Sequence, residues 1–186
     1  MGAELRQPSS EGAATPIWRH PDPLPAQIEA SLELGDSPNG ATLSLLTTDR
    51  TSRYRVRVQY ETSLALGDSG PHLDFHDWKH CLSSWHEASS EDGLNFVLPV
   101  PAEQEETCFP PVRAEEIVEQ TRRVLVGYDL GAEADAHWLQ IAREAQHAGG
   151  GQSYVAISTV RVRIEIRAPE GWRTLSILDF RLPMGC

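Results

Sequence analysis

The chain has 186 residues and a formal net charge of −11. Its length suits one domain with a full hydrophobic core, and no apolar run reaches the roughly 18 to 20 residues that a membrane-spanning helix requires. The negative charge disfavours nucleic acid and anionic membrane surfaces as partners and favours basic ones. We therefore expect no nucleic-acid partner and no membrane partner.

The three cysteines are Cys81, Cys108 and Cys186, and no two of them have CxxC spacing. This pattern argues against a disulfide framework and against a zinc knuckle. The first residues also lack the basic start and apolar core of a secretory signal. Together these features predict a reduced protein in the cytoplasm, with Cys108 as a half-buried thiol.

The first part of the chain, residues 1–25, is rich in Gly, Ala, Ser and Pro. Pro21, Pro23 and Pro25 are unsuited to a helix and cannot donate hydrogen bonds in a β-ladder. We predict a flexible N-terminal tail over residues 1–25, followed by a single domain over residues 26–186.

Three strands are predicted at the start of that domain, over residues 27–34, 41–48 and 52–61. Between the first two, GDSPNG is a strong turn signal, which predicts that these strands pair antiparallel. In the third strand, Tyr54, Val56, Val58 and Tyr60 point to one face, while arginines alternate with them on the other. One face of the sheet should therefore be packed, and the other solvated or covered by acidic groups.

The segment from Pro71 to His86 has a different period. Phe75, Trp78, Leu82 and Trp85 recur at helical spacing, which predicts a helix over about 75–87 with Asp74 as its N-cap. A short strand should follow over residues 94–100.

Two amphipathic helices and a long hairpin complete the pattern. The apolar stripe of the first helix runs through Ile117, Thr121 and Leu125, and that of the second through Trp138 and Ile141. Alternation over 160–167 and 174–182 predicts the hairpin. The fold class is therefore α+β, with a mainly antiparallel sheet of about six strands and helices packed on one face. The order is strand, strand, strand, helix, strand, helix, helix, strand, strand.

One candidate site lies in the predicted helix over 75–87. His76 and His80 are four residues apart, a spacing that on a helix can hold one Zn²⁺, and Asp77 between them would act as a base. No third ligand stands out by its spacing, and the two histidines lie opposite the apolar stripe. A solvated helix face explains them without a metal, so we predict neither a metal nor another cofactor.

A second candidate is an apolar pocket for a small molecule, lined by Tyr54, Trp78, Trp85 and Trp138. The same aromatic side chains would otherwise fill the core, which is the interpretation that we prefer.

The third candidate is an acidic stretch, in which six glutamates accompany a single cation, Arg113, between residues 103 and 119. The glutamates are Glu103, Glu105, Glu106, Glu115, Glu116 and Glu119. Concentrated charge of this kind serves as a docking surface for a basic protein, or simply as a solvated face. Small, acidic proteins without catalytic motifs are similar in general character to bacterial immunity and antitoxin proteins, an analogy of type. We therefore expect a non-enzymatic inhibitor of a basic partner, such as a toxin enzyme. The metal-dependent hydrolase and the small-molecule-binding domain remain as alternatives.

Overall fold

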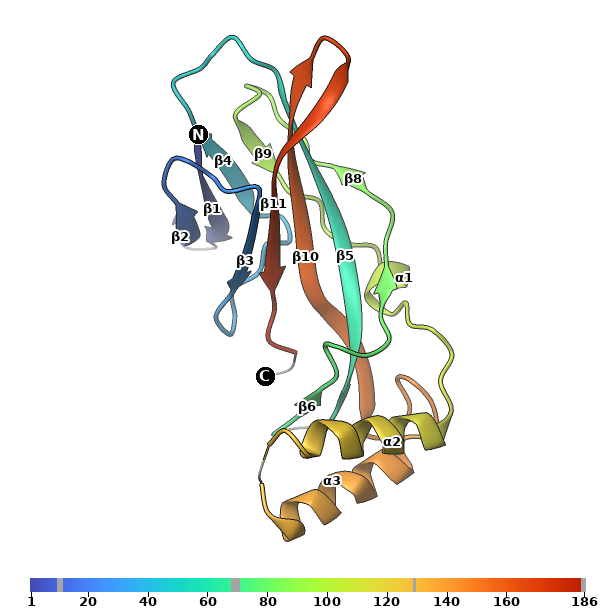
Figure 1. Cartoon of the computed structure of the whole chain (residues 1–186). Helices are drawn as coiled ribbons and strands as arrows, with labels where there is room; N and C mark the ends of the chain where they lie inside the picture. Colours follow the sequence, from blue (N-terminus) through green and yellow to red (C-terminus); the bar gives the residue numbers. More distant parts are fainter. Residues whose placement is uncertain (10–11, 68–70, 129, 185–186) are drawn as a thin grey trace. The chain divides into compact units, whose positions relative to one another are not determined.

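The computed structural model describes residues 1–9, 12–67, 71–128 and 130–184 of the chain. Within these residues it is mostly β, with 43% of the chain in strands and 16% in helices. The predicted α+β class is therefore wrong. A curled mixed sheet of seven strands and an antiparallel sheet of four strands dominate, and only three helices accompany them in the described part (Figure 1).

The chain divides into two compact units, which are described separately. Unit 1 comprises residues 1–60, 83–102 and 159–183, and unit 2 comprises residues 61–82, 103–158 and 184–186. Two long strands, β5 (Tyr54–Leu66) and β10 (Ser153–Ala168), contribute residues to both units.

The four-stranded sheet belongs to unit 1 and has the order β2-β1-β4-β9. Its strands are β1 (Gly2–Ser9), β2 (Gly12–His20), β4 (Thr42–Leu46) and β9 (Asn95–Val97). Residues 2–9 and 12–20 thus form paired strands where we expected a tail. Ala3 and Leu5 are fully buried, and β1 pairs with β2 on one side and β4 on the other, which together hold it in the sheet. Pro16 lies opposite Arg6, beside a shift in the β1–β2 register that accommodates a residue unable to donate a ladder hydrogen bond.

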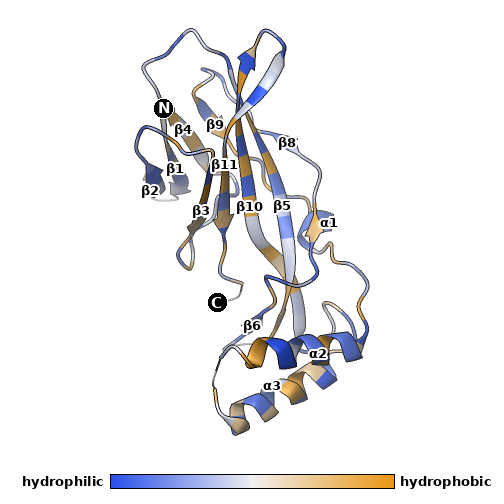
Figure 2. Ribbon diagram, viewed as in Figure 1, coloured by the Kyte–Doolittle hydropathy of each residue, from blue (hydrophilic) through white to orange (hydrophobic). Residues whose placement is uncertain are grey.

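The seven-stranded sheet contains β3 (Gln27–Ser31), β11 (Gly171–Arg181), β10, β5 and β6 (Leu73–Asp74), in that order. The short strands β7 (Cys81–Leu82) and β8 (His86–Glu87) also pair with β5. The predicted β10–β11 hairpin is confirmed, with Val162 opposite Leu178 and both side chains buried. Figure 2 shows the alternation of hydrophobic and hydrophilic residues along these strands.

The expected pairing of the first two predicted strands is wrong. β3 pairs parallel with β11, where Ile28 is opposite Leu178, whereas β4 pairs antiparallel with β1 and β9. The segment between them does turn, as predicted, but each strand pairs with a strand elsewhere in the sequence.

The predicted helix over 75–87 is also wrong. Phe75 and Trp78 form a turn, with the Trp78 N–H donating to the Phe75 carbonyl at 3.3 Å, and β7 and β8 follow as two short edge strands. Leu82 is 46% exposed rather than buried with the aromatic residues. The aromatic residues have different partners: Trp78 packs edge-on against Phe75 at 5.8 Å in unit 2, whereas Trp85 lies under Arg163 in unit 1.

Unit 2 contains the helices α1 (Glu103–Glu106), α2 (Ala114–Leu125) and α3 (Ala132–Glu144). The sequence predicted α2 and α3 but not the single turn of α1. These two helices lie side by side and bury the predicted stripes, with Ile117, Thr121 and Leu125 on α2 and Trp138 and Ile141 on α3 (Figure 1). No helix in the described ranges has the length and apolar character needed to cross a membrane.

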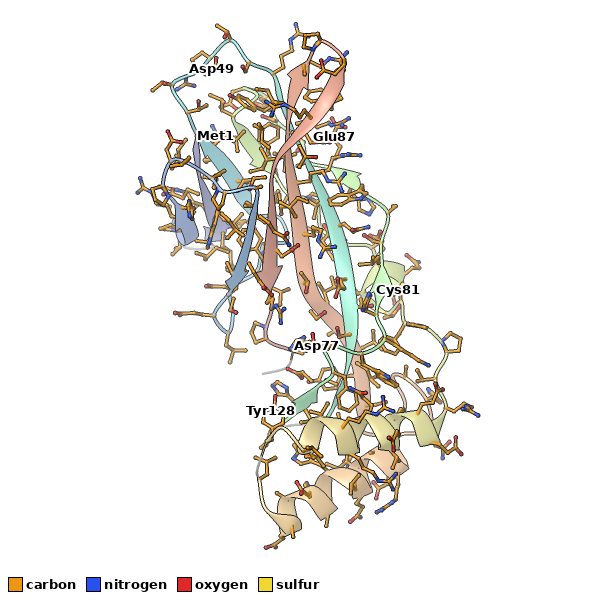
Figure 3. All side chains as sticks on the ribbon, in the orientation of Figure 1. Met1, Asp49, Asp77, Cys81, Glu87 and Tyr128 are labelled. Atoms are coloured by element: carbon orange, nitrogen blue, oxygen red, sulfur yellow. A yellow bond between two sulfur atoms is a disulfide. The ribbon has the colours of Figure 1, made fainter. Side chains whose placement is uncertain are left out.

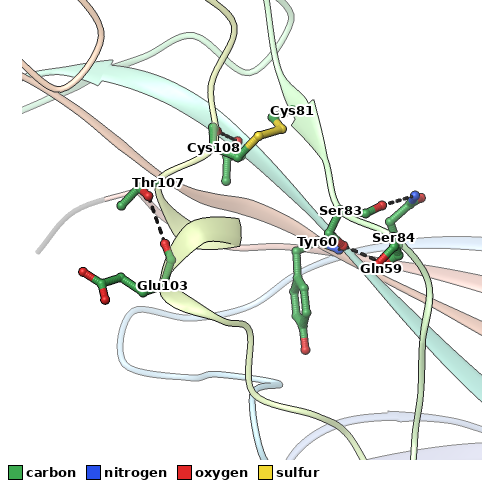
Figure 4. The surroundings of a disulfide bond; sticks show 9 residues. Gln59, Tyr60, Cys81, Ser83, Ser84, Glu103, Thr107 and Cys108 are labelled. Atoms are coloured by element: carbon green, nitrogen blue, oxygen red, sulfur yellow. Dashed lines mark hydrogen bonds between the residues drawn. A yellow bond between two sulfur atoms is a disulfide. The ribbon is translucent and has the colours of Figure 1, made fainter.

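Cys81 and Cys108 form a disulfide within unit 2 (Figure 4), which contradicts the expectation of free thiols. Their Cα atoms are 5.8 Å apart, although 27 positions separate them in sequence. Thr62 of β5 explains their meeting: it is opposite Cys81 in the β5–β7 pair, and its hydroxyl donates a hydrogen bond to the Cys108 carbonyl. The strand thus brings together two cysteines whose spacing carries no recognisable motif.

Candidate functional site

The histidine pair of the metal hypothesis is not arranged as ligands. Without a helix, His76 and His80 lose the i,i+4 geometry. His76 instead turns towards Asp74, with its Nε2 atom 3.6 Å from the carboxylate, while Asp77 and His80 are exposed. Figure 3 labels Asp77 on its turn. Among the described residues, no group of three His, Cys, Asp or Glu side chains has the geometry to hold a metal ion.

The four aromatic side chains expected to line one apolar pocket are also dispersed. Tyr54 lines a hollow in unit 1, and Trp138 lines a different one in unit 2. Trp78 borders a shallow polar hollow on α2, and Trp85 stacks on arginine. The structure therefore offers no common pocket for these four residues.

The six glutamates of the acidic stretch lie on two helices of unit 2. Glu103, Glu105 and Glu106 lie on α1, and the other three lie on α2. Glu103, Glu106 and Glu115 are exposed, and none of these three makes an ion pair with a described residue. They are the glutamates available to a partner.

Two of the α2 glutamates are already engaged. Glu116 accepts a hydrogen bond from the Lys79 ammonium at 2.7 Å and another from the Arg113 backbone N–H at 3.0 Å. The Lys79 hydrogen bond is the largest influence that lowers the Glu116 pKa from 4.5 to about 2. Glu119 lies 3.5 Å from Arg122 and 3.3 Å from Arg123. Glu116 and Glu119 therefore brace their own helix.

An exposed apolar patch follows α2 directly. The chain leaves the helix in a tight turn, in which the N–H groups of Gly127 and Tyr128 donate to the carbonyls of Val124 and Leu125. The turn leaves Val126 88% exposed, Tyr128 54% and Leu130 48%. Figure 3 labels Tyr128 here. We call Val126, Tyr128 and Leu130 the hairpin patch. α2 ends at Leu125, so Tyr128 lies beyond the helix and does not join its buried stripe.

A mainly apolar hollow of about 450 Å³ borders the hairpin patch within unit 2. Tyr128, Leu130 and Trp138 contribute to its walls. At its polar side, the Asp74 carboxylate lies between two imidazoles, 2.7 Å from Nδ1 of His72 and 3.6 Å from Nε2 of His76. The carboxylate thus fixes the orientation of His72.

Unit 1 contains an arginine-rich sheet face that the sequence analysis only partly anticipated. Arg55 and Arg57 both donate to the Glu165 carboxylate at 2.9 Å, and this carboxylate is only 4% exposed. On the same face, Arg161 donates to Asp179 at 2.6 Å. The expected acidic cover is therefore present, but it consists of two carboxylates from the sheet itself.

Tryptophan rings complete this face, stacked with the arginines as cation–π pairs. The Arg163 guanidinium carbon lies 4.0 Å from the centre of the Trp85 ring, and that of Arg55 lies 4.6 Å from the centre of the Trp172 ring. The Nε atom of Arg163 is buried without a hydrogen-bond partner in the described residues. The alternating arginines were visible in the sequence, but their partners come from distant strands and loops.

The chain was compared with protein-family models, with curated proteins and with solved structures, and none of them matches it.

Proposed function

We propose that this chain is a non-enzymatic protein-binding module that inhibits a basic partner protein by docking on it, as immunity and antitoxin proteins do. The observation that carries the proposal is the composition of the α2–α3 region. An exposed apolar patch lies at one end of α2, Glu115 lies at the other end, and Glu103 and Glu106 lie on α1; these three glutamates make no ion pair with a described residue.

The hairpin patch supplies the apolar part of the docking surface. Three large apolar side chains exposed within five residues are unusual on a monomeric surface and are typical of interfaces. The adjoining hollow of about 450 Å³ would receive an anchoring side chain of the partner.

The glutamates determine the sign of the charge expected on the partner. Glu103, Glu106 and Glu115 are exposed and unpaired among the described residues, so a basic surface would gain contacts without breaking existing ion pairs. Exposed charges of this kind mainly raise the association rate and exclude acidic partners. The proposal therefore covers a basic protein, such as a toxin enzyme, and not a nucleic acid.

The compartment is part of the proposal. The odd number of cysteines and their spacing favour the cytoplasm, but the Cys81–Cys108 disulfide is a feature more common in oxidising compartments. Alkylation of free thiols in intact cells, followed by mass spectrometry, tests the location: alkylated Cys81 and Cys108 support the cytoplasm, and an intact bond contradicts it.

Charge reversal tests the docking surface. The partner is first identified by co-purification, and its affinity is then measured for the variant E103K/E106K/E115K. We expect the affinity to fall about tenfold or more, mostly through slower association. The matched control is E33K/E91K/E170K, which reverses three exposed glutamates of unit 1 and should change the affinity less than about twofold.

A second variant tests the apolar part. V126S/Y128S replaces exposed side chains, so the fold should persist. In contrast to the charge-reversal variant, we expect this variant to lose affinity mainly through faster dissociation from the partner. Equal affinities of the wild type and both site variants would contradict the proposed surface. Undiminished activity of an enzymatic partner at saturating concentrations of the chain would contradict inhibition.

A further inference from the structure

The second hollow of interest lies entirely in unit 1 and measures about 720 Å³. It is formed by the loop before β5, by the first residues of β5, by the segment after β8 and by Trp172 of β11. Figure 3 labels Asp49 and Glu87 in this region. Its volume falls in the range of roughly 300 to 1,000 Å³ that is typical of small-molecule sites.

One wall of the hollow is rigid. Arg55 donates from Nε to Glu165 at 2.9 Å and lies over the Trp172 ring at 4.6 Å. A guanidinium held by a buried carboxylate and by an aromatic ring has little freedom left to lose on binding. Arg55 and Trp172 therefore form a pre-organised wall.

The loop that carries the other cations is also ordered. Asp49 accepts hydrogen bonds from the backbone N–H groups of Thr51 at 2.9 Å and Ser52 at 3.1 Å, and from both of their hydroxyls. These bonds, the Ser52 hydroxyl foremost, hold the pKa of the Asp49 carboxyl well below its usual range. The turn sets the backbone between Arg50 and Arg53.

Those two arginines, unlike Arg55, are not held by a carboxylate of the described residues. Arg50 and Arg53 are exposed, line the hollow and make no ion pair with any described residue. Asp92 also lines the hollow, but it accepts hydrogen bonds from the backbone N–H groups of Leu94 and Asn95. These bonds, that of Asn95 foremost, lower the Asp92 pKa to about 2. Glu87 is the remaining carboxylate of the lining.

We propose that this hollow binds the phosphate group of a small hydroxylated molecule of the sugar phosphate class. A phosphate monoester carries a charge of about −1.5 to −2 at pH 7, which two unpaired guanidinium groups match and one would not. The planar guanidinium fork suits phosphate oxygens. The exposed Glu87 carboxylate repels a second anionic group and accepts hydrogen bonds from hydroxyls, so it favours a sugar beside the phosphate.

The site is independent of the proposed docking function, because its residues belong to unit 1 and the docking surface belongs to unit 2. Isothermal titration calorimetry of the purified full chain at low salt tests it with three probes: ribose 5-phosphate, inorganic phosphate and ribose. We expect ribose 5-phosphate to bind, inorganic phosphate to bind more weakly, and ribose not to bind.

Matched variants separate the site from the general charge. R50A/R53A should weaken ribose 5-phosphate binding about tenfold or more, because each lost guanidinium removes charge-assisted hydrogen bonds. R143A/R173A removes two exposed arginines that do not line the hollow and should change the affinity less than about twofold. E87Q should lower the affinity for ribose 5-phosphate relative to that for inorganic phosphate, because the amide accepts weaker hydrogen bonds from hydroxyls and no longer repels anions.

Three results would overturn the proposal. They are no heat signal with ribose 5-phosphate, equal weakening in the two arginine double variants, or inorganic phosphate binding as tightly as ribose 5-phosphate. All the substituted side chains are exposed, and unchanged melting temperatures would show that each variant is folded.

Discussion

Removal of the Cys81–Cys108 disulfide should destabilise the protein by about 3.5 kcal/mol. The bond joins positions 27 apart in sequence. For a loop of this length, the chain-entropy relation says that the cross-link lowers the entropy of the unfolded chain by about 12 cal/mol/K. For a chain of this size, each kcal/mol corresponds to about 2 to 4 °C in Tm. We therefore expect the C81S/C108S variant to melt about 7 to 14 °C below the oxidised wild type.

Differential scanning calorimetry without reductant provides the assay. The wild type in reductant should melt with the C81S/C108S variant, and C186S should melt with the oxidised wild type. A thiol assay under denaturing conditions should detect a single reactive cysteine in the oxidised chain. Three reactive thiols, or a Tm of C81S/C108S within about 2 °C of the wild type, would refute the reasoning.

Three further substitutions test the packing and the charges. E165Q leaves Arg55 and Arg57 without their shared carboxylate and should lower the free energy of unfolding in urea by about 2 to 3 kcal/mol. The loss should be smaller than for a fully buried pair, because both arginines reach solvent. The control E170Q, on an exposed turn, should lower it by less than about 0.5 kcal/mol. W138A empties the core between α2 and α3 and should cost about 3 to 5 kcal/mol, whereas W138F should cost less than half of that; equal costs would show that the ring does not fill this core. E116Q tests pH dependence: the folded pKa is lowered from 4.5 to about 2, so the stabilisation by Glu116 is present above pH 4.5 and is lost as the pH falls through 2. The difference in Tm between wild type and E116Q should therefore shrink between pH 4.5 and 2, and a constant difference would contradict this.

Local periodicity was sufficient where burial follows the chain itself. Val56, Val58 and Tyr60 are buried in β5 as their alternation predicts, and Ile117 and Leu125 are buried in α2 as their helical spacing predicts. In each of these elements the apolar side chains all pack into the core, so the spacing of apolar residues in the sequence matches the spacing of buried residues in the structure.

Periodicity failed where neighbouring side chains have different partners. Phe75, Trp78 and Trp85 fit a helical stripe, but Trp78 packs on Phe75 and Trp85 on Arg163, and the edge of β5 accepts β7 and β8 instead. The sequence of residues 2–20 contains few apolar side chains. A few buried ones, such as Leu5, are enough to hold β1 in the sheet, because its pairing with β4 supplies backbone hydrogen bonds.

The candidate sites depended still more on tertiary structure. The acidic stretch was visible, but only the structure separates Glu115, which is unpaired among described residues, from Glu116, which holds Lys79. The hollow of unit 1 brings Arg53 together with Glu87 and Trp172, which are too far apart in sequence for any local pattern to connect them. Its only sequence signal was the row of arginines before and within β5.

The stacked arginines and tryptophans of unit 1 also bear on aggregation. A sheet face without helical cover is a surface on which a second sheet can stack, the arrangement that builds amyloid fibrils. On this face, Arg57 and Arg163 present fixed positive charges, and Trp85 lies across them. A second identical face would bring the guanidinium groups of two copies together, and the Glu165 carboxylate beside them is already shared by Arg55 and Arg57. We therefore expect the side chains that brace the sheet also to oppose the stacking of one copy of this protein on another.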